Sequence, residues 1–147
     1  MILVRPFSPT DMPWVMDIVR QSLGETYPPS LYLTVHNLWQ DGFLVLQADG
    51  LVVGFVATVP AGERLARVLM LAVRPECRGR GYAQRLMAEL YVKCLAKGYD
   101  TITLEVRKSN TDAISFYERQ GFVVSGDIKS FYSNGEDAYK MTKTLQS

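Results

Sequence analysis

The sequence is poor in histidine and cysteine, two residues that commonly bind metals. Its 147 residues include one histidine, His36, and two cysteines, Cys77 and Cys94. A metal centre in a protein usually needs three or four such ligands, so we expect no metal and interpret His36 as a packing or capping residue. Two cysteines are also too few for a disulfide framework, which favours a reducing, cytoplasmic location.

The chain also lacks a large net charge and a long hydrophobic run. Lys and Arg total 16 and Asp and Glu total 15, so the formal net charge is only +1. No stretch has the length of a membrane span, and residues 1–6 lead into a strand pattern without the layout of a signal peptide. We therefore expect neither nucleic acid nor a membrane as a partner.

Nothing in the sequence indicates a second domain. There is no internal repeat, low-complexity tract or linker, and hydrophobic residues make up 48% of the chain against 21% charged residues. This composition is typical of a globular protein that buries a substantial core. The sequence predicts one domain over residues 1–147.

Strand and helix patterns alternate along the chain. Strands are predicted at 2–5, 43–48, 51–59, 68–73, 101–107, 122–132 and 138–145, and helices at 12–23, 30–39, 82–97 and in a short segment before Gly121. Asp49-Gly50 and Ser133-Asn134-Gly135 are hairpin signals, and Pro60 is expected to end its strand. This order predicts an α/β (α+β) fold, a mixed sheet with helices on its faces.

Residues 74–83 join a predicted strand to a predicted helix through alternating arginines and glycines. Gly79 and Gly81 permit a tight backbone path, so that N–H groups can converge at the positive end of the following helix. Arg78 and Arg80 add positive charge there. Such a loop suits a phosphate or pyrophosphate, although the same turn also occurs as a simple helix entry.

Two motifs together resemble those of the GCN5-related N-acetyltransferases (GNAT). Arg78, Gly81 and Ala83 match Arg/Gln-x-x-Gly-x-Gly/Ala, the acyl-CoA pyrophosphate loop of that family. Residues 104–122, with Asn110 and Tyr117 among them, look like its second signature. The resemblance implies the GNAT fold, with a central, mixed and mostly antiparallel β-sheet that splays between strands 68–73 and 101–107.

The resemblance also implies how acetyl-CoA would be held as cosubstrate. Its pantetheine arm would lie in the splayed gap, with the backbone of Leu71, Ala72 and Val73 on one side and Asn110 on the other. The pyrophosphate would be held by Arg78, Gly79, Arg80, Gly81, Tyr82, Ala83 and Gln84. Asn110 can alternatively be an ordinary helix N-cap.

Direct acetyl transfer from a thioester requires a neutral amine and a proton for the departing thiolate. Tyr117 resembles the proton donor of the family and is also predicted to touch the cofactor. In the alternative interpretation, Tyr117 only packs its ring beside Phe116.

Two glutamates compete for the role of proton acceptor. Glu105 stands where the RimI-like branch of the family has its acceptor, although it can instead form an ion pair with Arg67 or Arg107. Glu25 resembles a glutamate that serves related protein N-terminal acetyltransferases. The sequence leaves the choice between Glu25 and Glu105 open.

The substrate hypothesis comes from two segments, 25–29 and 131–138. Both resemble loops of the archaeal and eukaryotic protein N-terminal (N-alpha) acetyltransferases, in which tyrosines contact the first residues of a peptide. Tyr27 and Tyr132 are therefore predicted to bind the substrate. The resulting hypothesis is acetyl transfer to a protein or peptide N-terminus by a monomer or homodimer. A small-molecule amine acetyltransferase, acting on a polyamine or aminoglycoside, and a non-catalytic acyl-CoA sensor are the alternatives.

Overall fold

The computed structural model describes residues 1–146 and folds them into a seven-stranded sheet with helices on both faces. The strands are β1 (Ile2–Pro6), β2 (Phe43–Ala48), β3 (Leu51–Gly62), β4 (Leu65–Val73), β5 (Thr101–Arg107), β6 (Val123–Ile128) and β7 (Ala138–Thr144). The helices are α1 (Met12–Ser22), α2 (Pro29–Leu38), α3 (Tyr82–Lys97) and α4 (Thr111–Arg119). The spatial order is β1-β2-β3-β4-β5-β7-β6, and only β4 and β5 pair in parallel. This confirms the predicted mixed, mostly antiparallel sheet.

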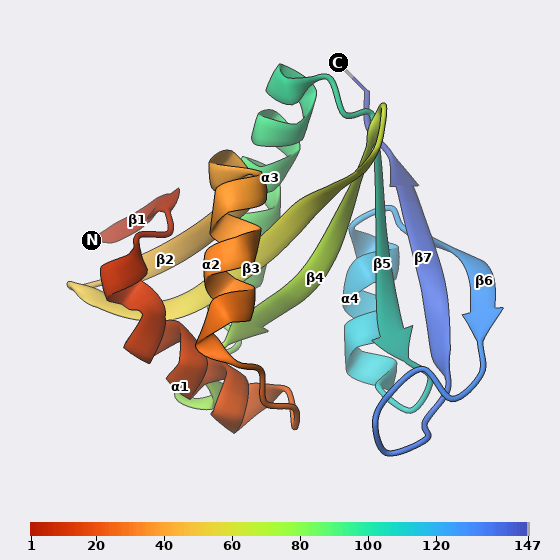
Figure 1. The fold of residues 1–147 in the computed structure, drawn as a ribbon, viewed down its shortest axis with the longest axis horizontal. Coiled ribbons are helices and arrows are strands. Elements are labelled where there is room, and N and C mark those ends of the chain that lie inside the picture. Colours follow the sequence, from red (N-terminus) through yellow and green to blue (C-terminus); the bar gives the residue numbers. More distant parts are fainter. Residues whose placement is uncertain (147) are drawn as a thin grey trace.

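The alternation of side chains along the strands divides the core into two layers. On β2, Phe43 and Val45 pack with α1 and α2, whereas Leu44 and Leu46 pack with α3, and all four are fully buried. This division follows from the two-residue period of a strand. As Figure 1 shows, α1 and α2 cover one face of the sheet, and α3 and α4 cover the other.

The sheet splays between β4 and β5, as predicted. Their parallel pairing stops after Val68 and Leu104, although β4 continues to Val73 and β5 to Arg107. The register between β3 and β4 skips Leu69, which marks a β-bulge directly after the last β4–β5 pair. Because a bulge bends its strand and increases its twist, Leu69 turns β4 away from β5. Figure 1 shows the two strands diverging below this point.

The strand β3 is longer than the sequence predicted. It passes through Pro60 and reaches Gly62, so the expected break at Pro60 is wrong, and β4 begins earlier than expected, at Leu65. Proline lacks an N–H group and is tolerated in strands at irregular positions. The register shift between Pro60 and Gly62 provides such a position.

The strand β6 is shorter than predicted, because it ends at Ile128 and not at Tyr132. Residues 129–137 form a longer loop, which contains the predicted tight turn at Ser133-Asn134-Gly135, because the Gly135 N–H donates to the Tyr132 carbonyl at 2.9 Å. Ser130 adopts a positive φ of 50°, and its N–H donates to Asp137 Oδ1 at 2.9 Å, which turns the chain out of the sheet. As a result, Tyr132 leaves the strand and lies beside the splayed gap.

Asp11 joins β1 to α1 and offers a test of the fold. Its carboxylate, in a residue only 6% exposed, accepts two hydrogen bonds from Arg5 at 2.8 and 2.9 Å and one from the Ser8 N–H at 2.8 Å. The bonds from Arg5 hold the pKa of Asp11 below its usual value. The folded state therefore gains stability above the unfolded pKa of about 3.9 and loses it as the pH falls through the lower folded value.

The substitution Asp11→Ala is expected to lower the free energy of unfolding by about 1–3 kcal/mol at pH 7, because it removes the carboxylate that pairs with the charged Arg5. Urea denaturation at pH 7 and near pH 3 measures the effect, which is expected to shrink at the lower pH. Asp127→Ala is the control, since its ion pair with Lys108 is solvent-exposed and contributes within about 0.5 kcal/mol. Equal losses in the two variants would contradict the prediction.

Candidate active site

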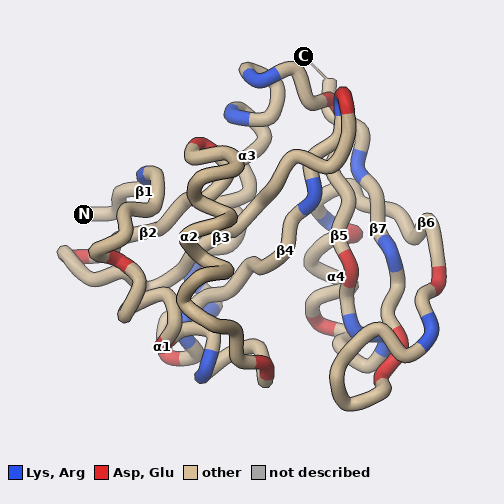
Figure 2. Tube along the Cα trace, viewed as in Figure 1, with Lys and Arg blue, Asp and Glu red and all other residues tan. Residues whose placement is uncertain are grey.

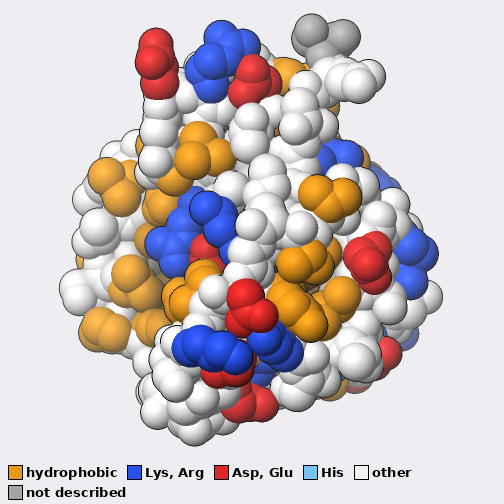
Figure 3. Space-filling model, turned by 90° about the vertical axis from the view of Figure 1, so that its right-hand side faces the viewer, with side chains coloured by type: hydrophobic (Ala, Val, Ile, Leu, Met, Phe, Trp, Pro, Cys, Tyr) orange, Lys and Arg blue, Asp and Glu red, His pale blue; other side chains and the backbone are white. Residues whose placement is uncertain are grey.

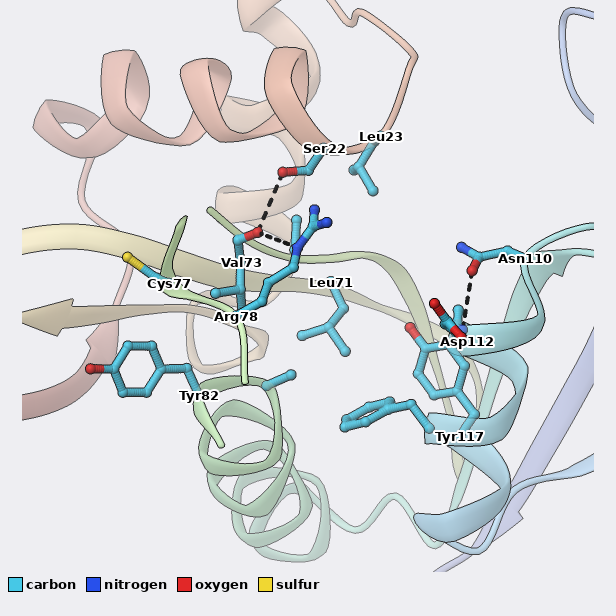
Figure 4. Close-up of a pocket in the computed structure, with 14 residues that line it drawn as sticks. Ser22, Leu23, Leu71, Val73, Cys77, Arg78, Tyr82, Asn110, Asp112 and Tyr117 are labelled. Atoms are coloured by element: carbon cyan, nitrogen blue, oxygen red, sulfur yellow. Dashed lines mark hydrogen bonds between the residues drawn. The ribbon is translucent and has the colours of Figure 1, made fainter. Parts of the chain in front are cut away.

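A cavity of about 380 Å³ opens where β4 and β5 separate, beside the glycine loop. We call it the loop-side cavity. It is lined by Ser22, Leu23, Leu71, Ala72, Val73, Cys77, Arg78, Tyr82, Ala83, Asn110, Asp112, Ala113, Phe116 and Tyr117. Figure 4 shows β4 and the loop on one side of this cavity and the start of α4, with Asn110 and Tyr117, on the other.

The backbone of β4 presents to this cavity polar groups that form no bond to β3. The Arg74 N–H donates to the Val53 carbonyl at 2.8 Å, which makes these two residues a hydrogen-bonded pair of the β3–β4 ladder. Since such pairs alternate along antiparallel strands, Ala72 also bonds to β3, whereas Leu71 and Val73 direct their N–H and C=O groups into the gap. Of the three residues predicted to pair with the pantetheine arm, Leu71 and Val73 therefore direct their backbone groups into the gap, and Ala72 does not.

The Val73 carbonyl is engaged by side chains from two other elements. It accepts hydrogen bonds from Arg78 Nε at 3.2 Å and from Ser22 Oγ at 3.4 Å, as Figure 4 shows. Arg78 thus folds back over the mouth of the cavity and brings positive charge there. Ser22, at the end of α1, is a contact that the sequence motifs did not reveal.

The glycine loop has the conformation that its sequence demands. Gly79 and Gly81 have φ values of 80° and 78°, a region that other residues enter only with strain. Gly81 is the N-cap of α3, so the free N–H groups of the first helical turn begin directly beside the cavity. The Tyr82 ring is buried in the core, leaving its backbone N–H to face a ligand, while Arg80 and Gln84 are exposed.

Asn110 is the N-cap of α4, and its geometry is compatible with both roles considered for it. Its Oδ1 accepts the Ala113 N–H at 3.1 Å, which is an ordinary N-cap interaction. In Figure 4, its amide nitrogen points toward the cavity. Capping therefore orients the side chain and leaves two N–H donors for a ligand.

Tyr117 stands between the loop-side cavity and a second, central cavity of about 560 Å³. Its ring packs edge-on against Phe116 and Phe122, with centroid separations of 5.3 and 5.6 Å, and its hydroxyl points into the gap in Figure 4. Burial, together with nearby Tyr132, raises the pKa of Tyr117. The phenol therefore keeps its proton at neutral pH.

Glu105 lies on β5, where the central cavity meets an outer cavity of about 330 Å³. Its Oε1 accepts two hydrogen bonds from Arg67, at 2.7 and 3.0 Å, so the ion pair considered as an alternative is present. Its Oε2 accepts no hydrogen bond from residues 1–146. The side chain is only 11% exposed, and Oε2 remains available to a substrate or a water molecule.

Glu25 belongs to a network that links the α1–α2 loop to the β6–β7 loop. Both of its carboxylate oxygens lie 3.0 Å from Ser133 Oγ, and Oε1 also accepts Arg107 Nη2 at 3.2 Å. Arg107 further pairs with Glu136 and stacks on the ring of Tyr132 at 3.9 Å. Glu25 is thus held by contacts with two loops and β5, whereas Glu105 is held by Arg67 through one oxygen alone.

Arg67, Arg107 and Ser133 shape the site without having been predicted as functional residues. One signal was available for Arg107, because the alternation along 101–107 places it on the same side of the strand as Glu105. No comparable signal exists for Ser133, which meets Glu25 across 108 positions of sequence.

Tyr27 and Tyr132 both line the central and outer cavities, which keeps them as candidates for substrate contact. Burial raises the pKa of Tyr132 to about 12, partly opposed by Arg107, and burial followed by the charge of Glu25 raises the pKa of Tyr27. Both side chains are neutral phenols at physiological pH. They can therefore offer hydrogen bonds and flat apolar surface to a peptide.

The remaining surface carries no extended field of one charge. Figure 2 shows acidic and basic residues interspersed along the chain, and the face in Figure 3 mixes hydrophobic side chains with small groups of both signs. Within residues 1–146, no group of three or more His, Cys, Asp or Glu side chains is arranged to hold a metal ion. In the same part of the chain, no helix has both the length and the apolar character needed to cross a membrane.

Comparison with known proteins gives consistent matches over nearly the whole chain. Residues 13–122 match the model of the acetyltransferase (GNAT) family. An uncharacterized N-acetyltransferase of Methanocaldococcus jannaschii is 35% identical over 97% of this chain and 91% of its own length. An N-alpha-acetyltransferase of Saccharolobus solfataricus is 34% identical over 92% of this chain and 88% of its own length. The crystal structure of Ard1 from Thermoplasma volcanium superimposes with a TM-score of 0.96 at 34% identity and covers 99% of both chains.

Proposed function

The chain belongs to the acetyltransferase (GNAT) family and is an N-acetyltransferase, and from this premise we propose that it acetylates the N-terminal α-amino group of a protein or peptide, using acetyl-CoA. One observation carries the proposal: a continuous series of cavities runs from the glycine loop, past Tyr117, to Tyr27 and Tyr132. Adjacent cavities in this series share lining residues, so an acyl donor at one end can meet a peptide from the other.

The residues of the loop-side cavity fit acetyl-CoA, which supplies an activated acetyl thioester. Leu71 and Val73 offer backbone groups to an extended, amide-containing arm, and Asn110 offers its amide nitrogen from the opposite side. The two left-handed glycines and Arg78 suit a pyrophosphate at the start of α3.

Glu105 and Tyr117 both line the central cavity and border different neighbouring cavities, which supports separate roles for them as proton acceptor and proton donor. Glu105 borders the outer cavity, and we assign it as the acceptor because its Oε2 is available, whereas Glu25 positions the surrounding loops. Tyr117 borders the loop-side cavity and donates its phenolic proton to the departing thiolate. Direct transfer requires this division of roles.

An α-amino group makes a modest demand on such a base. An α-amine with a pKa of about 7.7–8.0 is neutral in roughly a tenth to a fifth of the molecules at pH 7. A lysine side chain, with a pKa near 10.4, costs about 4.6 kcal/mol to deprotonate at the same pH. A single carboxylate oxygen is adequate to deprotonate the α-amine. A polyamine is less well matched, because Glu25 and Glu105 are each paired with an arginine and leave little surplus negative charge.

The proposal is tested by initial rates of CoA release with short peptides. Each peptide with a free N-terminus is compared with a control peptide whose N-terminus is blocked and whose only free amine is that of an internal lysine. We expect activity on free α-amines only. Activity restricted to lysine or to added polyamines would overturn the substrate assignment and leave the fold unaffected.

The glycine loop provides a separate prediction. Gly81→Ala is expected to raise the KM for acetyl-CoA about tenfold, because a side chain at φ 78° strains the loop and redirects its N–H groups. Gly98→Ala is the matched control, since Gly98 has φ 92° at the opposite end of the same helix. Both variants are expected to lose similar stability. An equal rise in KM for the control would contradict the assignment of the loop.

We expect the enzyme to work in the cytoplasm, which agrees with the free thiols of Cys77 and Cys94. We also expect a monomer or a homodimer. Light scattering of the purified chain distinguishes the two assemblies.

A further inference from the structure

The helix α4 carries Tyr117 but is short and only partly buried. It has nine residues, and its apolar side chains pack against the core without being buried as completely as Leu86 and Leu90 of α3. A helix of this length is marginally stable by itself, so contacts at its two ends help to fix its position. Asn110 caps the first turn. The contacts of the last turn therefore bear directly on where the Tyr117 hydroxyl lies.

A lysine from the sheet anchors the last turn of α4. Lys143 Nζ donates to the backbone carbonyl of Gln120, the C-cap residue, at 2.5 Å. The carbonyl groups of the last turn lack partners within the helix and carry its partial negative charge. An ammonium group therefore makes a stronger hydrogen bond there than a neutral donor would.

The surroundings of Lys143 keep its ammonium group in place. Lys143 lies on β7, which pairs with β5 on one side and with β6 on the other. Its Nζ is 5.1 Å from the centroid of the Tyr91 ring on α3, a cation–π arrangement. At Gly121, a Cβ atom would come within 2.8 Å of Nζ, so the lack of a side chain there leaves room for the ammonium group. The anchor thus belongs to a rigid part of the fold.

Backbone hydrogen bonds connect this anchor to Tyr117. The Gln120 N–H donates to the Phe116 carbonyl at 3.1 Å. The Phe122 N–H donates to the Tyr117 carbonyl at 3.0 Å. A shift of the helix end would therefore move the tyrosine, whose hydroxyl has to lie within hydrogen-bond reach of the group that it protonates.

We propose that Lys143 is a positioning residue for acetyl transfer, which anchors the end of α4 so that the Tyr117 hydroxyl points into the splayed gap. Lys143 lines none of the three cavities, so it acts through the helix and not by touching substrate or cofactor. The inference rests on the proposed function, because it depends on Tyr117 as the proton donor.

The substitution Lys143→Met tests the anchor, because it keeps most of the unbranched stem and removes the charge and the donor. Initial rates are measured with acetyl-CoA and a peptide with a free N-terminus. The kcat is expected to fall about tenfold, since a small misplacement of a reacting group slows a reaction on this scale, while the KM for acetyl-CoA stays within about twofold. An unchanged kcat would overturn the inference.

Lys97→Met is the matched control. Lys97 is also a cation in the last turn of a helix, α3, but it is exposed and forms no hydrogen bond or ion pair within residues 1–146. The control is expected to keep the wild-type kcat. An equal decrease in both variants would show that the contact with Gln120 is not the cause.

A double-mutant cycle separates the positioning of Tyr117 from a general loss of structure. The Tyr117→Phe enzyme has no hydroxyl to misplace, so adding Lys143→Met is expected to lower its kcat by no more than about twofold. A further tenfold decrease in that background would refute the inference and leave the proposed function intact. An unchanged kcat in Tyr117→Phe alone would refute both this inference and the proton-donor role on which it rests.

Circular dichroism and urea denaturation establish that each variant is folded under the assay conditions. If Lys143→Met does not fold, Lys143→Arg is used in its place. Its kcat is expected to stay within about threefold of the wild-type value, because a guanidinium group can also donate to a carbonyl at a helix end. A folded Lys143→Arg enzyme with a tenfold lower kcat would contradict the role of the anchor.

Discussion

Replacing Tyr117 with phenylalanine is expected to lower kcat by about 10- to 1,000-fold while leaving the affinity for acetyl-CoA nearly unchanged. The ring would keep its edge-on contacts with Phe116 and Phe122, so the cavity wall would persist. Only the hydroxyl group that points into the gap would be lost, and with it the proton for the departing thiolate. Steady-state kinetics and calorimetric titration with acetyl-CoA measure the two quantities separately.

Tyr91→Phe is the matched control for this variant. Tyr91 donates its hydroxyl to Gln120 Oε1 at 2.7 Å and does not line any of the three cavities, so its loss is expected to affect stability and not turnover. Unchanged turnover in Tyr117→Phe would remove the tyrosine from the mechanism.

The pH dependence of the wild-type enzyme reports on the same group. Burial raises the pKa of Tyr117, so the phenol remains protonated at a pH where a free tyrosine, with a pKa near 10, would ionise. The rate is therefore expected to increase as the substrate α-amine loses its proton near pH 8 and to show no falling limb around pH 10. A decline centred near pH 10 would indicate an unshifted phenol.

The second large effect is expected from Glu105→Gln, with a decrease in kcat of about 100-fold. This value is at the low end for general bases, because an α-amine is already partly neutral at pH 7. The isosteric amide can still accept a hydrogen bond from Arg67, so the geometry of β5 is expected to survive. The loss of kcat relative to the wild-type enzyme is expected to shrink between pH 7 and pH 9.5, because the neutral form of the substrate amine becomes abundant.

Glu25→Gln provides the comparison, because Glu25 lines the same two cavities but its carboxylate shares the single Ser133 hydroxyl hydrogen and accepts a bond from Arg107. Its loss is expected to increase the KM for the peptide more than it lowers kcat, since the link between the two loops is weakened. If Glu25→Gln instead produced the larger, pH-dependent loss of kcat, the two roles would be reversed.

Much of the fold could be predicted because it depends on local physics. The apolar period of α3, the hairpin signal at Asp49-Gly50 and the glycines of the loop each act within a few residues, and all appear in the structure as predicted. The Asn110 N-cap is equally local, since its oxygen bonds a backbone group three positions away. Two errors, at Pro60 and at the end of β6, arose where strand pairing and side-chain contacts overrode the local signals.

The sequence by itself determined the order of the elements, the phosphate-type loop and the motif that contains Asn110 and Tyr117, because these depend on backbone freedom and periodicity over short spans. Only the tertiary structure decided how they become one site. The bulge at Leu69 that opens the gap is visible only in the pairing of β3 with β4. The contacts of Arg67 with Glu105 and of Glu25 with Ser133 join residues 38 and 108 positions apart, so they exist only once the sheet and its loops have assembled.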